Sequence, residues 1–152
     1  MLLKELEGQI DLSRVHFIGR VPYPALLALF RVTAAHLYLT YPFVLSWSML
    51  DAMACGVPLL ASATAPVLEV VEEGVNGRLV EFFDPEAIAR GLAAMLADPA
   101  ALRPLREAAR RTVVERYDLR RVCLPQQLAL VEAVARMGAR GEGVSVPPAG
   151  PG

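Results

Sequence analysis

One stretch of this sequence places hydroxyl and carboxylate groups between two strongly apolar runs. In YPFVLSWSMLDAMACGVPLLAS, residues 41–62, Ser46 and Ser48 flank the single tryptophan, and Asp51 is the one carboxylate. Serine hydroxyls beside the free N–H groups of a helix N-terminus suit an anion such as phosphate. A carboxylate one turn later can accept hydrogen bonds from the two vicinal hydroxyls of a ribose. The residue types therefore suit a nucleotide diphosphate, although they do not require one.

A structural role accounts for the same side chains. Ser48 and Asp51 have the S-x-x-D spacing of a capping box, in which side chains satisfy the free backbone N–H groups of a helix start. Ser46 is an alternative N-cap for the same helix. On the residues alone, a helix cap and a nucleotide site both remain open.

The elements that must position this turn alternate between strands and helices. Apolar and β-rich runs predict strands at residues 15–18, 36–41, 59–62 and 78–82. Helical patterns follow at about residues 22–30, 47–55, 66–72, 84–97, 98–117 and 118–137. We therefore expect an α/β fold: a partial Rossmann-like parallel sheet of about four strands, with helices on both faces and a helical C-terminus. Ligands of such sheets bind at the carboxyl ends of the strands, where residues 41–51 lie.

Composition limits the possible partners and the setting. The chain has 152 residues and a net charge of −1, which argues against nucleic-acid binding by bulk electrostatics. Cys55 and Cys123 belong to no C-x-x-C motif or Cys/His cluster, so zinc is not expected, and two reduced thiols fit a cytoplasmic protein. No apolar run is long enough to span a membrane, and a membrane-surface role is not indicated. The Gly/Pro-rich residues 138–152 predict a disordered tail.

Several conspicuous residues have ordinary structural explanations. His16 and His36 lie in or beside expected strands and are expected to be packed or hydrogen-bonded. Trp47 suits stacking on a base or sugar, but we favour packing between sheet and helix. The arginine-rich residues 103–121 also contain acids, which is typical of a solvated helix face.

The motifs in their order carry a family resemblance. LDAMACGVPLLAS, followed by PVLEVVEEGVNGRLVEFFDPEAIARGLAAMLADP, resembles the donor-binding C-terminal half of the retaining family 4, or "group 1", glycosyltransferases of GT-B fold. That family has a helix opening with E-A-M-A-x-G-x-P, then a strand, P-E-x-x, G-x-x-G and D-P-E. The similarity covers about residues 15–134, which makes residues 1–137 a partial nucleotide-sugar-binding domain.

The resemblance implies roles for individual residues. Asp51 takes the place of the carboxylate that holds the nucleotide ribose, although Asp is one methylene shorter than the usual Glu. The segment that meets the diphosphate and sugar corresponds to Val44, Leu45, Ser46, Trp47 and Ser48. Glu69 matches the acid of P-E-x-x, or else complements the dipole of a helix start. Arg20 and Val21 match the G-x-V-P loop near the base. Phe43 stands where the family has its earlier Glu, and Thr64 begins the segment that replaces a Gly-rich turn.

The function implied is transfer of a sugar, with retention, from a UDP- or GDP-linked donor to an unknown acceptor, without a metal or other cofactor. The acceptor would bind an N-terminal domain, which a separate gene could encode, so we expect this chain alone to show little or no turnover. The alternative is a non-catalytic nucleotide-binding or protein-interaction module that needs a partner chain. A receiver-type domain fits less well, because no acidic pocket follows the early strands.

Overall fold

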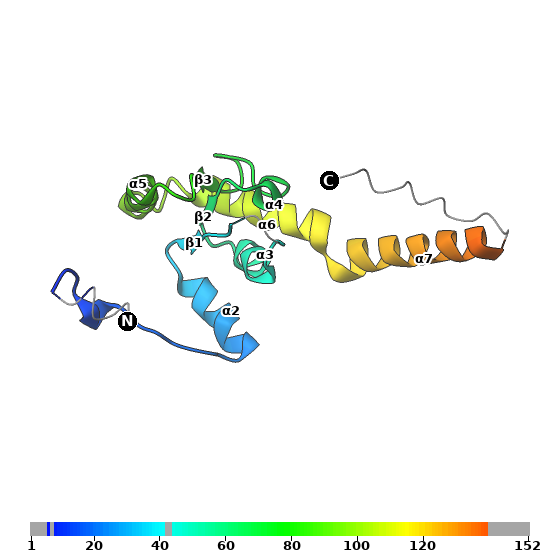
Figure 1. Cartoon of the computed structure of the whole chain (residues 1–152), viewed down its shortest axis with the longest axis horizontal. Coiled ribbons are helices and arrows are strands. Elements are labelled where there is room, and N and C mark those ends of the chain that lie inside the picture. Colours follow the sequence, from blue (N-terminus) through cyan, green and yellow to red (C-terminus); the bar gives the residue numbers. More distant parts are fainter. Residues whose placement is uncertain (1–5, 7, 42–43, 140–152) are drawn as a thin grey trace, which may run out of the picture.

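The structure is a computed structural model that describes residue 6 and residues 8–41 and 44–139. Within these residues three parallel strands form one sheet in the order β1-β2-β3, surrounded by helices (Figure 1). The strands are β1 (His36–Tyr38), β2 (Leu59–Ser62) and β3 (Arg78–Val80). The helices are η1 (Leu12–Arg14), α2 (Tyr23–Val32), α3 (Trp47–Ala54), α4 (Ala65–Leu68), α5 (Pro85–Ala97), α6 (Arg103–Tyr117), η2 (Leu119–Cys123) and α7 (Leu124–Ala139).

Strand β2 is the centre of the core. All four of its residues are buried, and its register pairs Leu60 with Leu37 of β1 and with Arg78 of β3. On one face, Leu59 and Ala61 join a cluster with residues of α3, α4 and α6. On the other face, Leu60 packs with residues of β3 and α5. Helices therefore cover both faces of β2, as its continuous apolar sequence predicts for a parallel strand.

The expectation of about four strands is wrong by one within the described residues. Residues 15–18 form no strand, and Phe17 and Ile18 are 69% and 56% exposed. An apolar run becomes a strand only where a neighbouring strand accepts its backbone hydrogen bonds. Figure 1 shows this segment running between η1 and α2, away from the sheet. The strands at β1 and β3 are also shorter than expected, ending at Tyr38 and Val80.

Local capping signals predicted most helix ends correctly. The Asp84 side chain accepts a hydrogen bond from the amide of Ala87 at 2.8 Å and starts α5. Gly56 follows α3 with φ of 69°, the left-handed conformation that ends helices. The helix expected from residue 98 instead begins at Arg103, because Asp98 caps a preceding turn through the amide of Ala101.

Three further boundaries differ from expectation or cannot be compared. The short helix expected over residues 66–72 is α4, Ala65–Leu68. Helix α7 continues to Ala139, so the predicted tail boundary at residue 138 is too early. The expected disorder of residues 140–152 lies outside the described residues.

The arginines of α6 are more than a solvated face, which corrects the sequence interpretation. Arg106 Nε donates to the carbonyl of Gly56 at 2.7 Å, and Arg110 Nη1 donates to the carbonyl of Ala54. Both carbonyls lie at the C-terminal end of α3, where unpaired oxygens and the helix dipole favour cations. Helix α6 therefore caps the end of α3 as well as packing along it.

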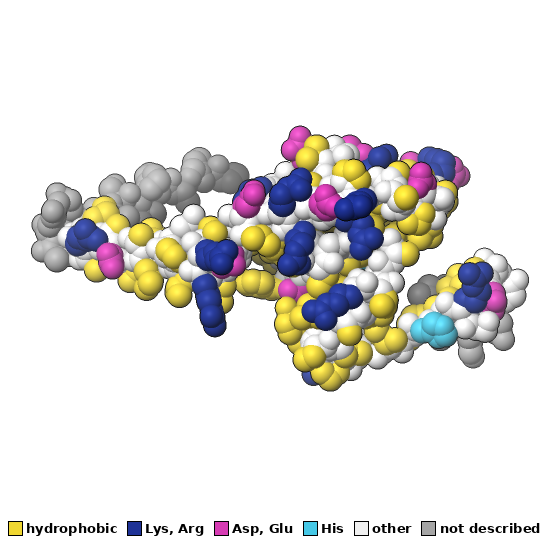
Figure 2. Space-filling view, turned by 180° about the vertical axis from the view of Figure 1, so that it is seen from behind, with side chains coloured by type: hydrophobic (Ala, Val, Ile, Leu, Met, Phe, Trp, Pro, Cys, Tyr) yellow, Lys and Arg dark blue, Asp and Glu magenta, His cyan; other side chains and the backbone are white. Residues whose placement is uncertain are grey.

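Helix α7 projects from the rest of the protein and contacts η2 (Figure 1). Figure 2 shows hydrophobic side chains along this projecting helix. The large hydrophobic side chains of α7 that are at least 43% exposed are Leu124, Leu128, Leu130, Val131, Val134 and Met137. No helix in the described residues is both long and apolar enough to cross a membrane.

Candidate functional site

The carboxyl ends of β1 and β2 are joined by one buried side chain. Ser62 Oγ accepts a hydrogen bond from the amide of Thr40 at 3.0 Å and donates to the carbonyl of Thr40 at 2.8 Å. Ser62 is completely buried. The serine therefore continues the contact between the two strands past Tyr38, the last residue of β1, into the segment that leads to α3.

A second tie positions the start of α3. The phenol oxygen of Tyr38 accepts a hydrogen bond from the amide of Ser46 at 3.0 Å. Ser46 is the N-cap, and its hydroxyl accepts from the amide of Ser48 at 3.2 Å and lies 2.8 Å from the Ser48 hydroxyl. The alternative cap at Ser46 is thus confirmed, and the capping box of Ser48 with Asp51 is wrong. The two serine hydroxyls form one pair at the helix start.

Asp51 is held by a residue that the sequence analysis did not assign to the site. Tyr23 Oη donates a hydrogen bond to Asp51 Oδ1 at 2.9 Å, across 28 residues of sequence. This bond to a carboxylate, more than any other cause, raises the pKa of Tyr23 above its ordinary value. Tyr23 is the first residue of α2. Its place directly after the loop containing Arg20 and Val21 is the one signal in the sequence that pointed to it.

The Asp51 side chain also borders a cavity of about 380 Å³ between α3, α6 and η2. The other lining residues are mostly apolar: Leu45, Trp47, Leu50, Ala54, Val113, Tyr117 and Cys123. Trp47 is 82% exposed. Our expectation that Trp47 packs between sheet and helix is therefore wrong, because the first turn of α3 directs this position outward.

The remaining predicted residues occupy separate places. Arg20 is exposed and Val21 half-buried in the loop before α2, whereas Val44 is 70% exposed before α3. Glu69 is the C-cap of α4, so its interpretation as a helix-start acid is wrong. Glu69 borders a hollow with Arg116, whose guanidinium donates to the Glu69 carbonyl at 3.2 Å. Position 43 lies outside the described residues.

The structure therefore joins Asp51 to the start of α2 and leaves Glu69 elsewhere. The family described as "Glycosyl transferases group 1" matches residues 3–112. The chain belongs to the group 1 glycosyl transferases.

Relatives of this group 1 chain are much longer than the chain itself. An uncharacterized glycosyltransferase of Methanocaldococcus jannaschii is 29% identical over 117 residues, which cover 76% of this chain and 30% of that protein. Sucrose-phosphate synthase of Thermosynechococcus elongatus has a similar structure, with a TM-score of 0.74, 27% identity, and coverage of 89% of this chain and 33% of its own. Anabaena Alr3699/HepE, solved in complex with UDP, has a TM-score of 0.72 and 27% identity over 87% of this chain and 36% of its own.

Two buried polar atoms of the group 1 chain have no hydrogen-bond partner among the described residues. They are Thr64 Oγ1, just after β2, and His36 Nε2 on β1. Burial lowers the pKa of His36, whose ring lies between those of Phe30 and Tyr38. His36 is thus a packed histidine, as expected, whereas His16 is exposed before α2 and is not packed, which corrects the expectation for it. Thr64 leaves an unpaired hydroxyl at the carboxyl end of the central strand, where ligands of parallel sheets bind.

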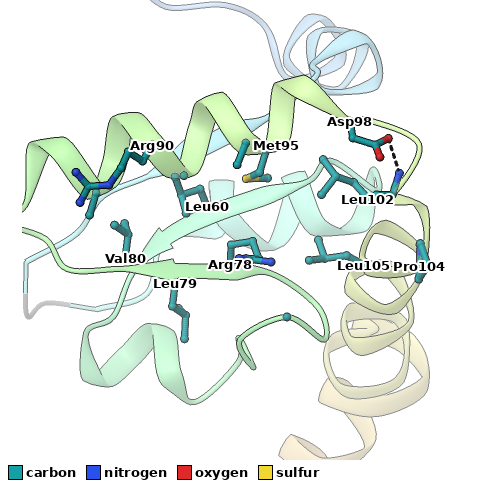
Figure 3. Close-up of a pocket in the computed structure, with 15 residues that line it drawn as sticks. Leu60, Arg78, Leu79, Val80, Arg90, Met95, Asp98, Leu102, Pro104 and Leu105 are labelled. Carbon is teal, nitrogen blue, oxygen red and sulfur yellow. Dashed lines mark hydrogen bonds between the residues drawn. The ribbon is translucent and has the colours of Figure 1, made fainter.

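Another cavity lies on the other side of the sheet (Figure 3). It has a volume of about 610 Å³ and is walled by β2, β3, α5 and the start of α6. Its polar side chains are already paired: Arg78 with Glu73, Arg90 with Glu86, and Asp98 with the amide of Ala101. None of the residues predicted for the site lines this cavity, so it is not our candidate site.

Among the residues that the structure describes, no three His, Cys, Asp or Glu side chains are grouped so as to hold a metal ion. The candidate site is therefore the surface around Asp51, Tyr23 and the Ser46–Ser48 turn.

Proposed function

We propose that this chain binds the nucleotide-sugar donor of a glycosyltransferase that transfers a hexose, with retention, from a UDP- or GDP-linked sugar. The observation that carries the proposal is the position of Asp51. Its carboxylate, which the motif resemblance matches to the family's ribose-binding acid, lies on α3, and Tyr23 ties it to the end of the loop of Arg20 and Val21, the proposed neighbours of the base. The complex of Anabaena Alr3699/HepE with UDP supports UDP as the first nucleotide to test.

The diphosphate is proposed to lie at the N-terminus of α3, where free N–H groups and the helix dipole favour anions. The amides of Ser46 and Ser48 already donate to Tyr38 and Ser46. We therefore assign the phosphate contacts to the two serine hydroxyls and to the amides of Leu45 and Trp47. Val44 is retained as a contact of the diphosphate and sugar, and Glu69 as a donor contact, on their places in the motifs alone, since Glu69 lies apart from Asp51 at the C-cap of α4.

Catalysis by such a site depends on positioning the donor and stabilising the departing diphosphate electrostatically. No metal or other cofactor is part of the proposal. The acceptor is proposed to bind a separate N-terminal domain, so the chain alone is expected to bind the donor without turnover. The proposed setting is the cytoplasm, which suits the two free cysteines, Cys55 and Cys123.

A second candidate function rests on α7. Its exposed apolar side chains, among them Leu128 and Val131 at 55% and 65%, favour a non-catalytic interaction module that binds another protein. Such a module needs no nucleotide affinity. Nucleotide binding therefore distinguishes the two proposals.

The test is isothermal titration calorimetry of UDP and of GDP with the 152-residue chain and its Asp51→Ala variant. Loss of charge-assisted hydrogen bonds worth about 1.5–3 kcal/mol is expected to weaken binding roughly 10-fold or more. Asp11→Ala is the matched control, because Asp11 caps the exposed η1 turn and should leave binding unchanged. Absence of binding to the wild-type chain, shown by circular dichroism to be folded, would overturn the donor-binding proposal and favour the interaction module.

A further inference from the structure

The Tyr23–Asp51 pair presents two oxygen acceptors beside each other. Tyr23 Oη gives its proton to Asp51 Oδ1 at 2.9 Å and so keeps its own lone pairs available. Asp51 Oδ2 is the second acceptor, since the bond from Tyr23 uses the other carboxylate oxygen. A pair of acceptors on one surface matches the two donors of a vicinal diol.

The phenol lies on the protein surface. Tyr23 is 56% exposed, and it stands at the first position of α2, outside the three hydrophobic clusters of buried residues. An exposed hydrogen bond contributes little to folding stability compared with the burial of a core side chain. A phenol is protonated at neutral pH, and the bond to Asp51 raises the pKa of Tyr23 further. The hydroxyl therefore stays a donor to Asp51 and an acceptor for a ligand.

The pair also offsets the shortness of the aspartate. Asp51 stands where the resemblance places Glu, and it reaches one methylene less far from α3. Tyr23 comes from a different helix and brings its oxygen to the carboxylate from the side of the Arg20–Val21 loop. A ligand hydroxyl beyond the reach of Asp51 could therefore donate to the phenol oxygen, which the carboxylate polarises through the shared proton.

We propose that Tyr23 and Asp51 together form the ribose-binding element of this chain, with one ribose hydroxyl donating to Tyr23 Oη and the other to Asp51 Oδ2. This proposal rests on the donor-binding function proposed above and adds Tyr23 as a ligand-contacting, specificity-determining residue. Its consequence is a preference for ribonucleotides over deoxyribonucleotides, in which one of the two donors is absent.

The experiment compares UDP, 2′-deoxy-UDP and 3′-deoxy-UDP by calorimetry on the wild-type chain and on Tyr23→Phe; the corresponding GDP series is used if the chain binds GDP instead. Loss of one hydrogen bond to a neutral phenol is expected to weaken UDP binding roughly 2- to 10-fold. In the wild type, each deoxy analogue should bind more weakly than UDP. In Tyr23→Phe, one analogue should bind as tightly as UDP, because the contact of the missing hydroxyl is already lost. The other analogue should still bind more weakly than UDP, because Asp51 still makes that contact. Ser13→Ala is the control for loss of an exposed hydroxyl, since the Ser13 hydroxyl bonds to Asp11 in the exposed η1 turn, away from the candidate site.

Each other outcome counts against the proposal in a distinguishable way. If Tyr23→Phe binds UDP and both deoxy analogues as the wild type does, Tyr23 has no role and the donor-binding function stands. If the variant lowers the affinity for all three ligands by the same factor, Tyr23 only supports the structure of the site. If the folded wild-type chain binds neither UDP nor GDP, this proposal and the donor-binding function both fail.

Discussion

Ser62 and Thr40 are hydrogen-bonded in both directions, with Ser62 Oγ accepting from the Thr40 amide at 3.0 Å and donating to the Thr40 carbonyl at 2.8 Å. Strand β1 ends two residues earlier, at Tyr38, so this side chain satisfies backbone groups that the sheet no longer pairs. The segment leading to Ser46 and Asp51 starts from this fixed point.

Ser62→Ala is therefore expected to destabilise the chain by about 1–3 kcal/mol, because it leaves the amide and the carbonyl of Thr40 without their partner. Urea unfolding followed by circular dichroism measures the change. Ser13→Ala is the control, since the Ser13 hydroxyl bonds to Asp11 in an exposed turn. Equal midpoints for the two variants would show that the Thr40 groups find other partners.

Gly77 lies too close to its neighbours to carry a side chain. A Cβ at this position would lie 2.6 Å from Cγ1 of Val71, which is itself only 3% exposed. We expect Gly77→Ala to destabilise the chain by about 1–3 kcal/mol through overpacking. Gly138→Ala in α7 meets no atom within 4 Å and should raise stability by up to about 1 kcal/mol through helix propensity. Thermal unfolding measures the melting temperature of both variants. A lower melting temperature for Gly77→Ala and a higher one for Gly138→Ala would support these predictions, whereas shifts in the same direction would contradict them.

His36 gives stability a pH dependence. Burial lowers its pKa in the folded chain, so the unfolded chain binds the proton more readily. The stabilising effect of a neutral His36 is fully present above the unfolded pKa of about 6.5 and is lost as the pH falls toward the lower folded pKa.

This predicts that His36→Leu has a shallower fall in unfolding free energy than the wild type as the pH decreases from about 7. Denaturant titrations at a series of pH values measure the slopes. His16→Leu removes the other histidine, which is exposed, and should keep the wild-type slope. If the His36 variant shows the wild-type slope as well, proton uptake by other groups accounts for the dependence.

The guanidinium groups of Arg106 and Arg110 should hold the end of α3 in place. The double variant Arg106→Ala/Arg110→Ala loses both contacts to the carbonyls of Gly56 and Ala54, and we expect a loss of about 1–2 kcal/mol. Arg103→Ala breaks only an exposed pair with Glu107 on the same helix and should change stability by about 0.5 kcal/mol or less. Calorimetric melting of both proteins tests the difference. A double variant no less stable than Arg103→Ala would mean that solvent replaces the contacts.

Local signals in the sequence correctly predicted helix ends that depend on contacts within a few residues. Asp84 and Gly56 mark helix ends through hydrogen bonds and backbone angles within a few residues. Residues 15–18 show the limit of such signals, because an apolar run is a strand only when another strand lies beside it. The alternation of helices and strands still predicted the parallel sheet, since βα units leave few other arrangements.

Local signals identified only part of the candidate site. The motif around Asp51 identified one carboxylate, but the tyrosine that bonds to it is 28 residues earlier in the chain. Arg106 and Arg110 likewise meet their partners across 50 and 56 residues. Contacts at such separations follow from the packing of whole helices, which composition and spacing do not specify.

The burial of β2 between two neighbours also determines how fast its backbone protons exchange with solvent. All four residues of β2 are buried and the strand is bonded on both sides, whereas β1 and β3 each have one neighbour in the described sheet. In deuterated water, each amide of β2 exchanges only when the ladder that it bonds to opens inside the buried core. The amides of residues 59–62 should therefore be the last in the sheet to take up deuterium, and their rate should report global unfolding.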